Sequence, residues 1–375
     1  MYSDIKLCVK SKQRLSKTFS STCGIRQGDI LSPQLFNIFI NDFPGILDES
    51  SEAPLLTDTV VHSLIYADDL ILLSKSEQGL QSSMKKLEEF CNEWHLSVNT
   101  QKSKVMVFNK QGKLLKCTIK YNDHPLESVR SHTYLEIKIS CKGNFEECKN
   151  DLYSKGLKAY FKLCKNIGQN DLHIDTAIHL FDHTVRQILL YGAEIWGQFS
   201  CKSTKLRSTQ FKIERAYEGI QQEKINIKFC KFILNVNKYA CNNGVRGELG
   251  RYPLHIDIIL AMIKFWIRFE KQDTSRLLKE AYKCNLNLHE QNIETWTTSI
   301  FTILKELKLD FLLQQKNKDP QHIIPKVKKL LKQRYENYWQ ESMHNDKRPR
   351  QNEQNKLRTY RKFKINFEKE EYLHI

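Results

Sequence analysis

The chain has 375 residues, of which 40% are hydrophobic and 10% aromatic, and its 59 Lys and Arg against 43 Asp and Glu give a formal net charge of +16. This composition supplies enough apolar side chains for real cores and excludes wholesale disorder. No run approaches 18 consecutive apolar residues, and the N-terminus lacks the apolar stretch of a secretory signal, so we expect an intracellular protein without membrane contact. The 11 cysteines include no C-x-x-C pair, and neither a zinc site nor a disulfide framework is expected.

The first 140 residues alternate between helical and strand patterns. Segment 33–42 is predicted to be a helix, because it opens on a proline and places apolar residues one turn apart. In segment 61–73 two short apolar runs flank a polar centre at 67–69, which predicts a tight β-hairpin with acidic residues at its tip. A second helix is expected over 79–95, a strand at 104–108, and further strands over 115–140 with a turn at 122–125.

From about residue 144 the pattern is mostly helical to the C-terminus, apart from a polar stretch at 344–355 that is typical of a loop. Segment 325–375 holds twice as many basic as acidic residues, interleaved with aromatic residues such as Tyr335 and Trp339. Such a stretch is typical of nucleic-acid surfaces. A solvated basic helix whose aromatic side chains pack inward explains it equally well, and the sequence leaves both interpretations open.

Two adjacent carboxylates, Asp68 and Asp69, occupy the tip of the predicted hairpin. Side-by-side negative charges repel each other, and a bound divalent cation removes that penalty. Carboxylate oxygens are hard ligands that select Mg²⁺ or Mn²⁺. The alternative is an ordinary acidic turn, because Asp is common at turns.

Three blocks in order resemble reverse transcriptases of the non-LTR, LINE-type retrotransposon branch. Residues 66–69 (YADD) resemble the catalytic hairpin of these enzymes, residues 24–37 (GIRQGDILSPQLFN) their nucleotide-pocket block, and residues 96–108 (LSVNTQKSKVMVF) their next palm block. Later segments at 190–196, 245–250 and 356–360 resemble the C-terminal tails of such elements.

The resemblance implies catalytic roles for three residues. Polymerisation transfers a nucleotidyl group by in-line displacement between two metal ions. Asp68 is implied as a metal ligand and Asp69 as its less direct partner, with Mg²⁺ or Mn²⁺ as the cofactor. Lys102 resembles the lysine that protonates the leaving pyrophosphate, although a surface lysine on a turn is the alternative.

The resemblance also implies binding residues. The residues expected to line the incoming-nucleotide pocket are Arg26, Gln27, Gly28 and Tyr66. Tyr134 and Leu135 resemble the primer grip, a hairpin in which the family usually has glycine where this chain has Glu136. The implied partners are an RNA template, a DNA primer and deoxynucleoside triphosphates, while protein partners stay unknown.

The expected fold class is α+β. An incomplete polymerase palm sheet with helices is expected at 1–140, a helical thumb-like region at 141–275, and a basic helical C-terminal region at 276–375.

The family's metal clamp uses a further Asp on a strand ahead of the Arg-Gln-Gly block. Here 25 residues precede Arg26, and Asp4 is the only acidic residue among them. We therefore expect a truncated reverse transcriptase domain that is inactive alone. The alternative is a non-catalytic nucleic-acid-binding protein derived from a retroelement. The nucleus is a candidate location, on basic charge and resemblance alone.

Overall fold

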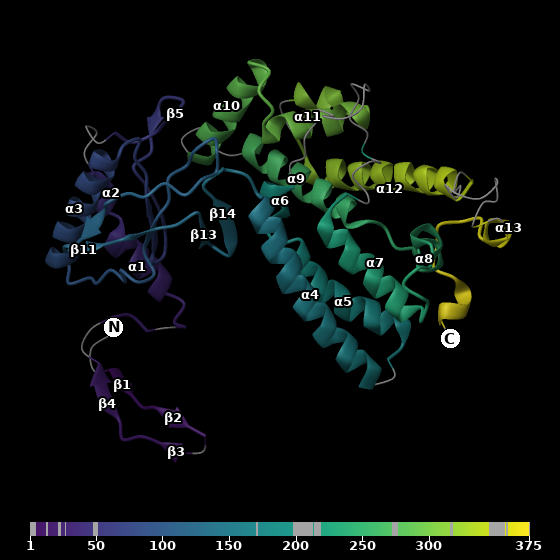
Figure 1. Ribbon diagram of the computed structural model, residues 1–375, viewed down its shortest axis with the longest axis horizontal. Coiled ribbons are helices and arrows are strands. Elements are labelled where there is room, and N and C mark those ends of the chain that lie inside the picture. Colours follow the sequence, from purple (N-terminus) through teal and green to yellow (C-terminus); the bar gives the residue numbers. More distant parts are fainter. Residues whose placement is uncertain are drawn as a thin grey trace. The chain divides into compact units, whose positions relative to one another are not determined.

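The computed structural model describes residues 5–12, 14–21, 24–26, 28–47, 52–169, 172–197, 213, 219–271, 277–315, 318–344, 357 and 359–374 (Figure 1). The chain forms two compact units. Unit 1 comprises Met1–Val105 and Leu115–Val129, and unit 2 comprises Met106–Leu114 and Arg130–Ile375. No helix in the described part of the chain is long and apolar enough to cross a membrane. The predicted loop at 344–355 lies outside the described residues, apart from His344.

Unit 1 opens with a long antiparallel ribbon. Strand β1 (Ile5–Leu7) pairs with β4 (Phe19–Ser21), and β2 (Lys10–Ser11) pairs with β3 (Arg14–Leu15). Several apolar side chains of this ribbon are exposed: Leu7, Val9, Leu15 and Phe19. The ribbon therefore adds little to the core of the unit.

The rest of unit 1 combines three helices with short strands. The helices are α1 (Ser32–Ile40), α2 (Phe43–Ile46) and α3 (Glu77–Glu93). The strands are β5 (Leu55–Leu56), β6 (Thr59–Val60), β7 (Ser63–Tyr66), β8 (Asp69–Leu72), β9 (Lys104–Val105), β10 (Lys120–Tyr121), β11 (His124–Pro125) and β12 (Glu127–Ser128). Helices α1 and α3 confirm the two predicted helices, and the predicted turn near residue 122 joins β10 to β11.

The core of unit 1 forms under helix α3. The hydroxyl of Ser76 caps the helix by accepting a hydrogen bond from the backbone N–H of Gly79 at 3.0 Å. Its apolar face places Met84, Leu87 and Phe90 in the core, where the Phe90 ring lies 5.2 Å from that of Phe43.

All described strands form two-stranded sheets, and no larger sheet occurs among the described residues. Unit 1 is therefore built from helices and small pairs of strands. The predicted strand at 104–108 is shorter than expected. Only Lys104 and Val105 pair, in parallel, with the two residues of β12.

Unit 2 begins with a hairpin of β13 (Ser131–Tyr134) and β14 (Ile137–Ser140) and continues as helices, which confirms the predicted helical half. The helices are α4 (Glu146–Gln169), α5 (Ile174–Leu189), α6 (Ala193–Trp196), α7 (Gln221–Ile233), α8 (Asn242–Glu248), α9 (Leu254–Lys271), α10 (Leu277–Glu290), α11 (Trp296–Glu306), α12 (Pro320–His344) and α13 (Tyr360–Phe363). Two short 3-10 helices, η2 (Asp310–Leu313) and η3 (Glu371–His374), complete the element order.

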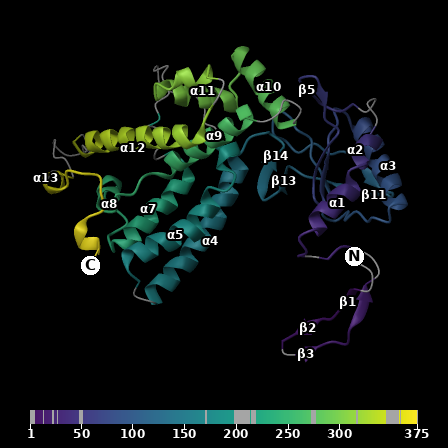
Figure 2. The ribbon, with the colours of Figure 1, turned by 180° about the vertical axis from the view of Figure 1, so that it is seen from behind.

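Helices α4, α5 and α7 run side by side as a small bundle, as both views show (Figures 1 and 2). The rings of Phe181 on α5 and Phe229 on α7 are stacked, with centroids 4.1 Å apart. Helices α4 and α5 approach closely at Gly156, where an added Cβ would lie 2.3 Å from Cδ2 of Leu189. Any larger residue at this position would have to displace the buried side chain of Leu189, so glycine permits the close approach of the two helices.

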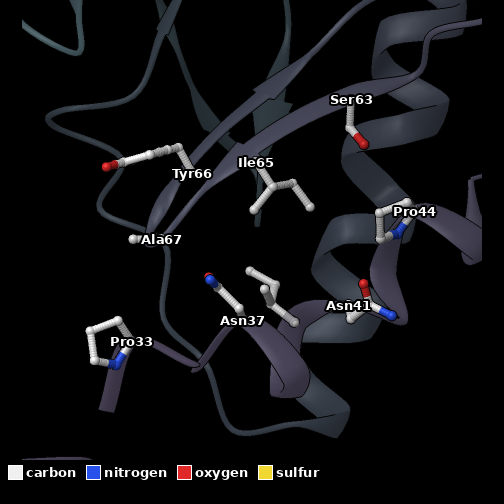
Figure 3. Close-up of a pocket in the computed structure, with 9 residues that line it drawn as sticks. Pro33, Asn37, Asn41, Pro44, Ser63, Ile65, Tyr66 and Ala67 are labelled. Carbon is white, nitrogen blue, oxygen red and sulfur yellow. The ribbon is translucent and has the colours of Figure 1, made fainter. Parts of the chain in front are cut away.

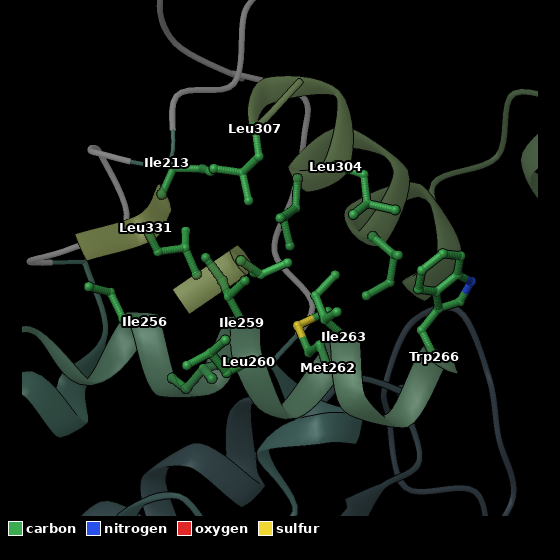
Figure 4. Close-up of a cluster of buried hydrophobic side chains, with 14 of the residues drawn as sticks. Ile213, Ile256, Ile259, Leu260, Met262, Ile263, Trp266, Leu304, Leu307 and Leu331 are labelled. Atoms are coloured by element: carbon green, nitrogen blue, oxygen red, sulfur yellow. The ribbon is translucent and has the colours of Figure 1, made fainter. Parts of the chain in front are cut away.

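Helix α9 is the centre of the largest core. Ile259, Ile263 and Trp266 are fully or almost fully buried against α11 and α12 (Figure 4). The indole N–H of Trp266 donates a hydrogen bond to the hydroxyl of Tyr282 at 2.9 Å, so the buried ring also has its polar group satisfied.

The basic C-terminal segment packs its aromatic residues inward on α12. Tyr335 and Trp339 are each 1% exposed, and both rings contact Phe367. The inward-packed interpretation therefore holds for these two side chains. The lysines at 326, 328 and 329 of the same helix are exposed.

Candidate active site

The hairpin of β7 and β8 presents the two adjacent carboxylates. Tyr66 pairs with Asp69, which leaves Ala67 and Asp68 as a two-residue turn. Ile65, Leu70 and Leu72 of the two strands pack on the core of unit 1, whereas Asp68 and Asp69 are exposed. The hairpin predicted from the sequence is confirmed, and both carboxylates face solvent at its tip.

The turn itself holds a residue in an unfavourable conformation. Ala67 has a φ of 52°, in the left-handed region where an L-residue other than glycine costs about 1–2 kcal/mol. Two-residue hairpin turns favour glycine at such positions. Local strain of this kind is often retained at functional sites, so the conformation of Ala67 is consistent with a turn shaped for its exposed carboxylates.

A cavity of about 450 Å³ lies between helix α1 and this hairpin (Figure 3). Its lining comes from α1 and the start of α2 on one side and from β7 and the turn on the other: Pro33, Asn37, Ile40, Asn41, Pro44, Ser63, Ile65, Tyr66 and Ala67. In Figure 3 the side chain of Asn37 points toward the hairpin. The volume lies in the range of small-molecule sites.

Two polar residues of this cavity, Asn41 and Ser63, do not stand out in the sequence. Asn37 and Asn41 are four residues apart and therefore lie on the same face of α1. This spacing of two amide side chains, at the C-terminal end of the helix, is the signal that could have found Asn41. Ser63 begins β7 and has no such signal, because a lone serine at a strand end is common.

The segment ahead of α1 forms a loop that leads into the helix. The backbone N–H of Asp29 donates to the carbonyl of Arg26 at 3.3 Å, and a carboxylate oxygen of Asp29 accepts from the N–H of Leu31 at 3.1 Å. Gly28 has a φ of 91°, which only glycine adopts readily. Arg26 and Gly28 are exposed, whereas Gln27 and Asp4 lie outside the described residues.

Lys102 lies in the turn between α3 and β9 and is exposed. Its backbone N–H donates to the side-chain oxygen of Asn99 at 3.1 Å, so the turn is held by an Asn side chain. Lys102 belongs to unit 1, like the carboxylate hairpin. The geometry is compatible both with a general acid and with a surface lysine.

Tyr134 and Leu135 lie in unit 2, at the end of the β13–β14 hairpin. Leu135 and Glu136 form its two-residue turn, with φ values of 46° and 63°. This is the type I′ geometry, in which both turn residues have positive φ and glycine is favoured. A Glu136 carboxylate oxygen lies 3.1 Å from Nζ of Lys155, and this contact, together with that from Asp151, raises the pKa of Lys155.

Asp68 and Asp69 suit a hard divalent cation, since both offer exposed carboxylate oxygens at one turn. Within the described ranges no group of three or more His, Cys, Asp or Glu side chains is placed to hold a metal ion. Asp68 and Asp69 are therefore a pair of adjacent carboxylates and not part of such a group.

Part of the amino-acid sequence matches a known protein family. Residues 2–139 match the family described as reverse transcriptase (RNA-dependent DNA polymerase). The chain is 24% identical over 209 residues to the RNA-directed DNA polymerase from mobile element jockey of Drosophila melanogaster, a match that covers 52% of this chain and 22% of that protein.

Two further relatives are also products of mobile elements. One is the Pol polyprotein from the type-1 retrotransposable element R2 of Nasonia vitripennis, 34% identical over 90 residues, covering 24% of this chain and 9% of that protein. The other is named as a probable RNA-directed DNA polymerase from transposon BS of Drosophila melanogaster, 26% identical over 271 residues, covering 66% and 28%.

Residues 2–139 therefore belong to the reverse transcriptase family. The relatives are products of non-LTR mobile elements, which supports a LINE-type reverse transcriptase for this segment. The chain spans less than a third of the length of each of these three relatives. The resemblance found in the three sequence blocks is thus confirmed at the level of the family.

Proposed function

We propose that unit 1 carries the nucleotidyl-transfer centre of an RNA-directed DNA polymerase, with the β7–β8 hairpin as its metal-binding element. The observation that carries this proposal is the exposure of Asp68 and Asp69 together at a two-residue turn beside the cavity under α1. Two adjacent exposed carboxylates next to a cavity of nucleoside size supply part of what two-metal chemistry requires of a protein.

In this proposal the chain binds and orients the reactants. A bound Mg²⁺ or Mn²⁺ pair would supply charge stabilisation to the attacking and leaving oxygens. Asp68 would be a direct ligand of the metal, and Asp69 would contribute to the same metal site less directly. The loop containing Arg26, Gln27 and Gly28 receives the incoming nucleotide, where the absence of a Cβ at Gly28 leaves the backbone accessible. The ring of Tyr66, which is 65% exposed, lies beside the cavity and contributes to the same pocket.

The remaining roles are also proposals. Lys102 acts as the general acid toward pyrophosphate, and the hairpin of Tyr134 and Leu135 positions the primer. Residues 1–140 act as a partial palm, 141–275 as a thumb-like region and 276–375 as a basic C-terminal region. We place the protein in the nucleus, where the DNA of a mobile element would be its target.

Primer extension on an RNA template with Mg²⁺ or Mn²⁺ tests the centre. Two polypeptides are compared, the 375-residue chain and the same chain extended upstream by a segment that supplies the family's further Asp. A two-metal clamp usually needs more carboxylates than Asp68 and Asp69, so we expect extension from the longer polypeptide only. In that polypeptide Asp68→Asn should reduce extension at least a hundredfold.

Asp58→Asn is the matched control, because Asp58 is an exposed Asp in the turn of the neighbouring β5–β6 hairpin. It should leave the rate unchanged. Equal rates for Asp68→Asn and the unchanged polypeptide would reject the hairpin as the catalytic element. If both polypeptides bind nucleic acid and neither extends a primer, the function is instead that of a non-catalytic nucleic-acid-binding protein derived from a retroelement.

A further inference from the structure

Helices α4 and α7 of unit 2 share an exposed basic surface outside the segment that matches the reverse transcriptase family. We call it the α4–α7 basic face. Its members are exposed residues spaced one turn apart on each helix: Lys158, Phe161, Lys162 and Lys165 on α4, and Lys224 and Lys228 on α7. Residues three or four positions apart lie on the same side of a helix, so each set forms one stripe.

This face contains no opposing charge of its own. No Asp or Glu occurs between residues 152 and 170 or between residues 224 and 247. The nearest acidic residue on α7, Glu223, is buried and paired with Arg246 at 2.8 Å. Lysines at the start of α4 behave differently, because Lys149 pairs with Glu146 and Lys155 pairs with Asp151.

Among the described residues, no ion pair involves a lysine of the α4–α7 basic face. Five ammonium groups on two adjacent helices therefore repel one another without local compensation. A polyanion that lies across both helices removes this repulsion and releases its own counterions. The charge pattern is thus complementary to a phosphate backbone.

An aromatic ring lies within the same face. Phe161 is 54% exposed, although its neighbour Tyr160 is buried and fills the bundle core. Nζ of Lys228 on α7 lies 4.4 Å from the centroid of the Phe161 ring, so the ring joins the two lysine stripes. Exposing so much of an apolar ring on a helix does not help the core. It provides a surface on which a planar group can stack beside ammonium groups.

We propose that the α4–α7 basic face binds a single-stranded polynucleotide, with an unpaired base stacked on Phe161 and the backbone phosphates held by the flanking lysines. Bases in a duplex are already stacked on one another, whereas an unpaired base has a free face for an aromatic ring. This inference rests on the proposed function in one respect, because it names a surface of unit 2 on which a polymerase would hold its template.

Binding is measured by fluorescence anisotropy, with no nucleotide or divalent metal present, so the result does not depend on catalysis. The probes are a labelled unstructured 20-nucleotide RNA, the DNA of the same sequence, and the matching duplex. The test variant is Lys162→Glu/Lys165→Glu/Lys228→Glu. Its control, Lys85→Glu/Lys116→Glu/Lys120→Glu, changes the charge by the same amount at exposed lysines of unit 1. Circular dichroism and melting curves verify that each variant is folded.

We expect the test variant to bind both single strands at least tenfold more weakly. A plot of the logarithm of its affinity against the logarithm of the salt concentration should also be shallower. The slope should change by about 0.7 for each phosphate that the lysines no longer neutralise. The control should weaken binding less than threefold. An equal weakening in the two variants would assign binding to overall charge and overturn the proposal. Duplex binding as tight as that of the single strands would overturn it too.

The ring is tested by a matched pair of substitutions that leave the lysines in place. Phe161→Tyr keeps an aromatic face and should bind like the unchanged chain. Phe161→Leu keeps an apolar side chain without a ring and should weaken single-strand binding roughly fivefold or more. Equal affinities for the two would refute base stacking at this position. If Asp68→Asn leaves primer extension by the longer polypeptide unchanged, that result counts against the carboxylate hairpin alone and does not affect the binding measured here.

Discussion

The hydroxyl of Tyr191 donates a hydrogen bond to the backbone carbonyl of Leu135, across an O–O distance of 3.2 Å. Tyr191 in turn accepts at its own carbonyl from the indole N–H of Trp196 at 2.6 Å. An added Cβ at Gly192 would lie 2.5 Å from Cδ1 of Ile137. The segment at 190–196 thus packs on the β13–β14 hairpin, which resembles a primer grip. Two segments that both resemble the family, and that are far apart in the chain, are therefore in direct contact.

Glycine in place of Glu136 is predicted to stabilise the turn of that hairpin. Glu136 has a positive φ, and its carboxylate in the ion pair with Lys155 is 74% exposed, so the pair contributes at most about 1 kcal/mol. Glu136→Gly should remove the left-handed penalty of about 1–2 kcal/mol at the expense of some unfolded-state entropy. We expect the free energy of unfolding to rise by up to about 1 kcal/mol in urea denaturation. Glu136→Ala, which keeps a Cβ, should not raise it.

A close approach at Gly247 predicts opposite effects for two glycines of the same helix. A Cβ at Gly247 would lie 2.8 Å from Cζ2 of the buried Trp339, whereas a Cβ at Gly244 meets nothing closer than 3.8 Å. Gly247→Ala should lower the free energy of unfolding by about 1–3 kcal/mol through overpacking. Gly244→Ala should be neutral or stabilising by up to about 1 kcal/mol, through helix propensity. Thermal melting of the two variants measures the difference, and equal shifts would contradict the packing described for α8.

The buried ion pair between Arg246 and Glu223 is predicted to be sensitive to the loss of one partner. Their side chains are 0% and 2% exposed, and Glu223 also accepts hydrogen bonds from Asn226 and from the backbone of Leu254. Arg246→Met leaves a buried carboxylate without its cation and should cost about 3–5 kcal/mol. Adding Glu223→Gln should recover part of that loss, because the charge is removed while an acceptor oxygen remains. A double-mutant cycle in urea denaturation measures the coupling free energy between Arg246 and Glu223. If the losses from the two single substitutions simply add, the two side chains are not coupled.

His255 predicts a dependence of stability on pH. Complete burial lowers the pKa of its imidazole from 6.5 to about 4. Between these two values the unfolded chain binds a proton that the folded chain excludes, so the contribution of this group to stability is full above pH 6.5 and is lost as the pH falls toward 4. Urea midpoints measured from about pH 7.5 to about pH 4.5 should fall on acidification. The His255→Gln variant should show a flatter profile over the same range, and an unchanged slope would contradict this assignment.

Local patterns of the sequence were sufficient for the elements that position the carboxylates. The apolar runs around Asp68 and Asp69 predict the hairpin because its pairing involves neighbouring residues only. The helical period at 79–95 finds α3 within two residues at each end. Family resemblance then assigns chemistry to the turn, which a pair of Asp residues alone does not.

Contacts between distant segments could not be predicted in this way. Arginine is mostly a surface residue, and nothing in the segment at 245–250 indicates that Arg246 is buried against Glu223. The alternation of aromatic and basic residues on α12 left two interpretations open, and the burial of Tyr335 and Trp339 is a tertiary fact. The pairing of Lys228 with Phe161 likewise depends on how α4 and α7 pack.

The hydrogen-bonded contact of Lys369 with Asp175 joins residues 194 positions apart, and the backbone of Glu370 bonds to that of Glu248 nearby. On the ribosome, which adds about 5–20 residues per second, the carboxylate on α5 therefore waits roughly 10–40 s before its partner is synthesised. During that interval the surfaces of α5 and α8 that receive the last residues are uncovered. Unit 2 thus completes its folding only after translation has passed residue 370, and until then these surfaces depend on protection from aggregation.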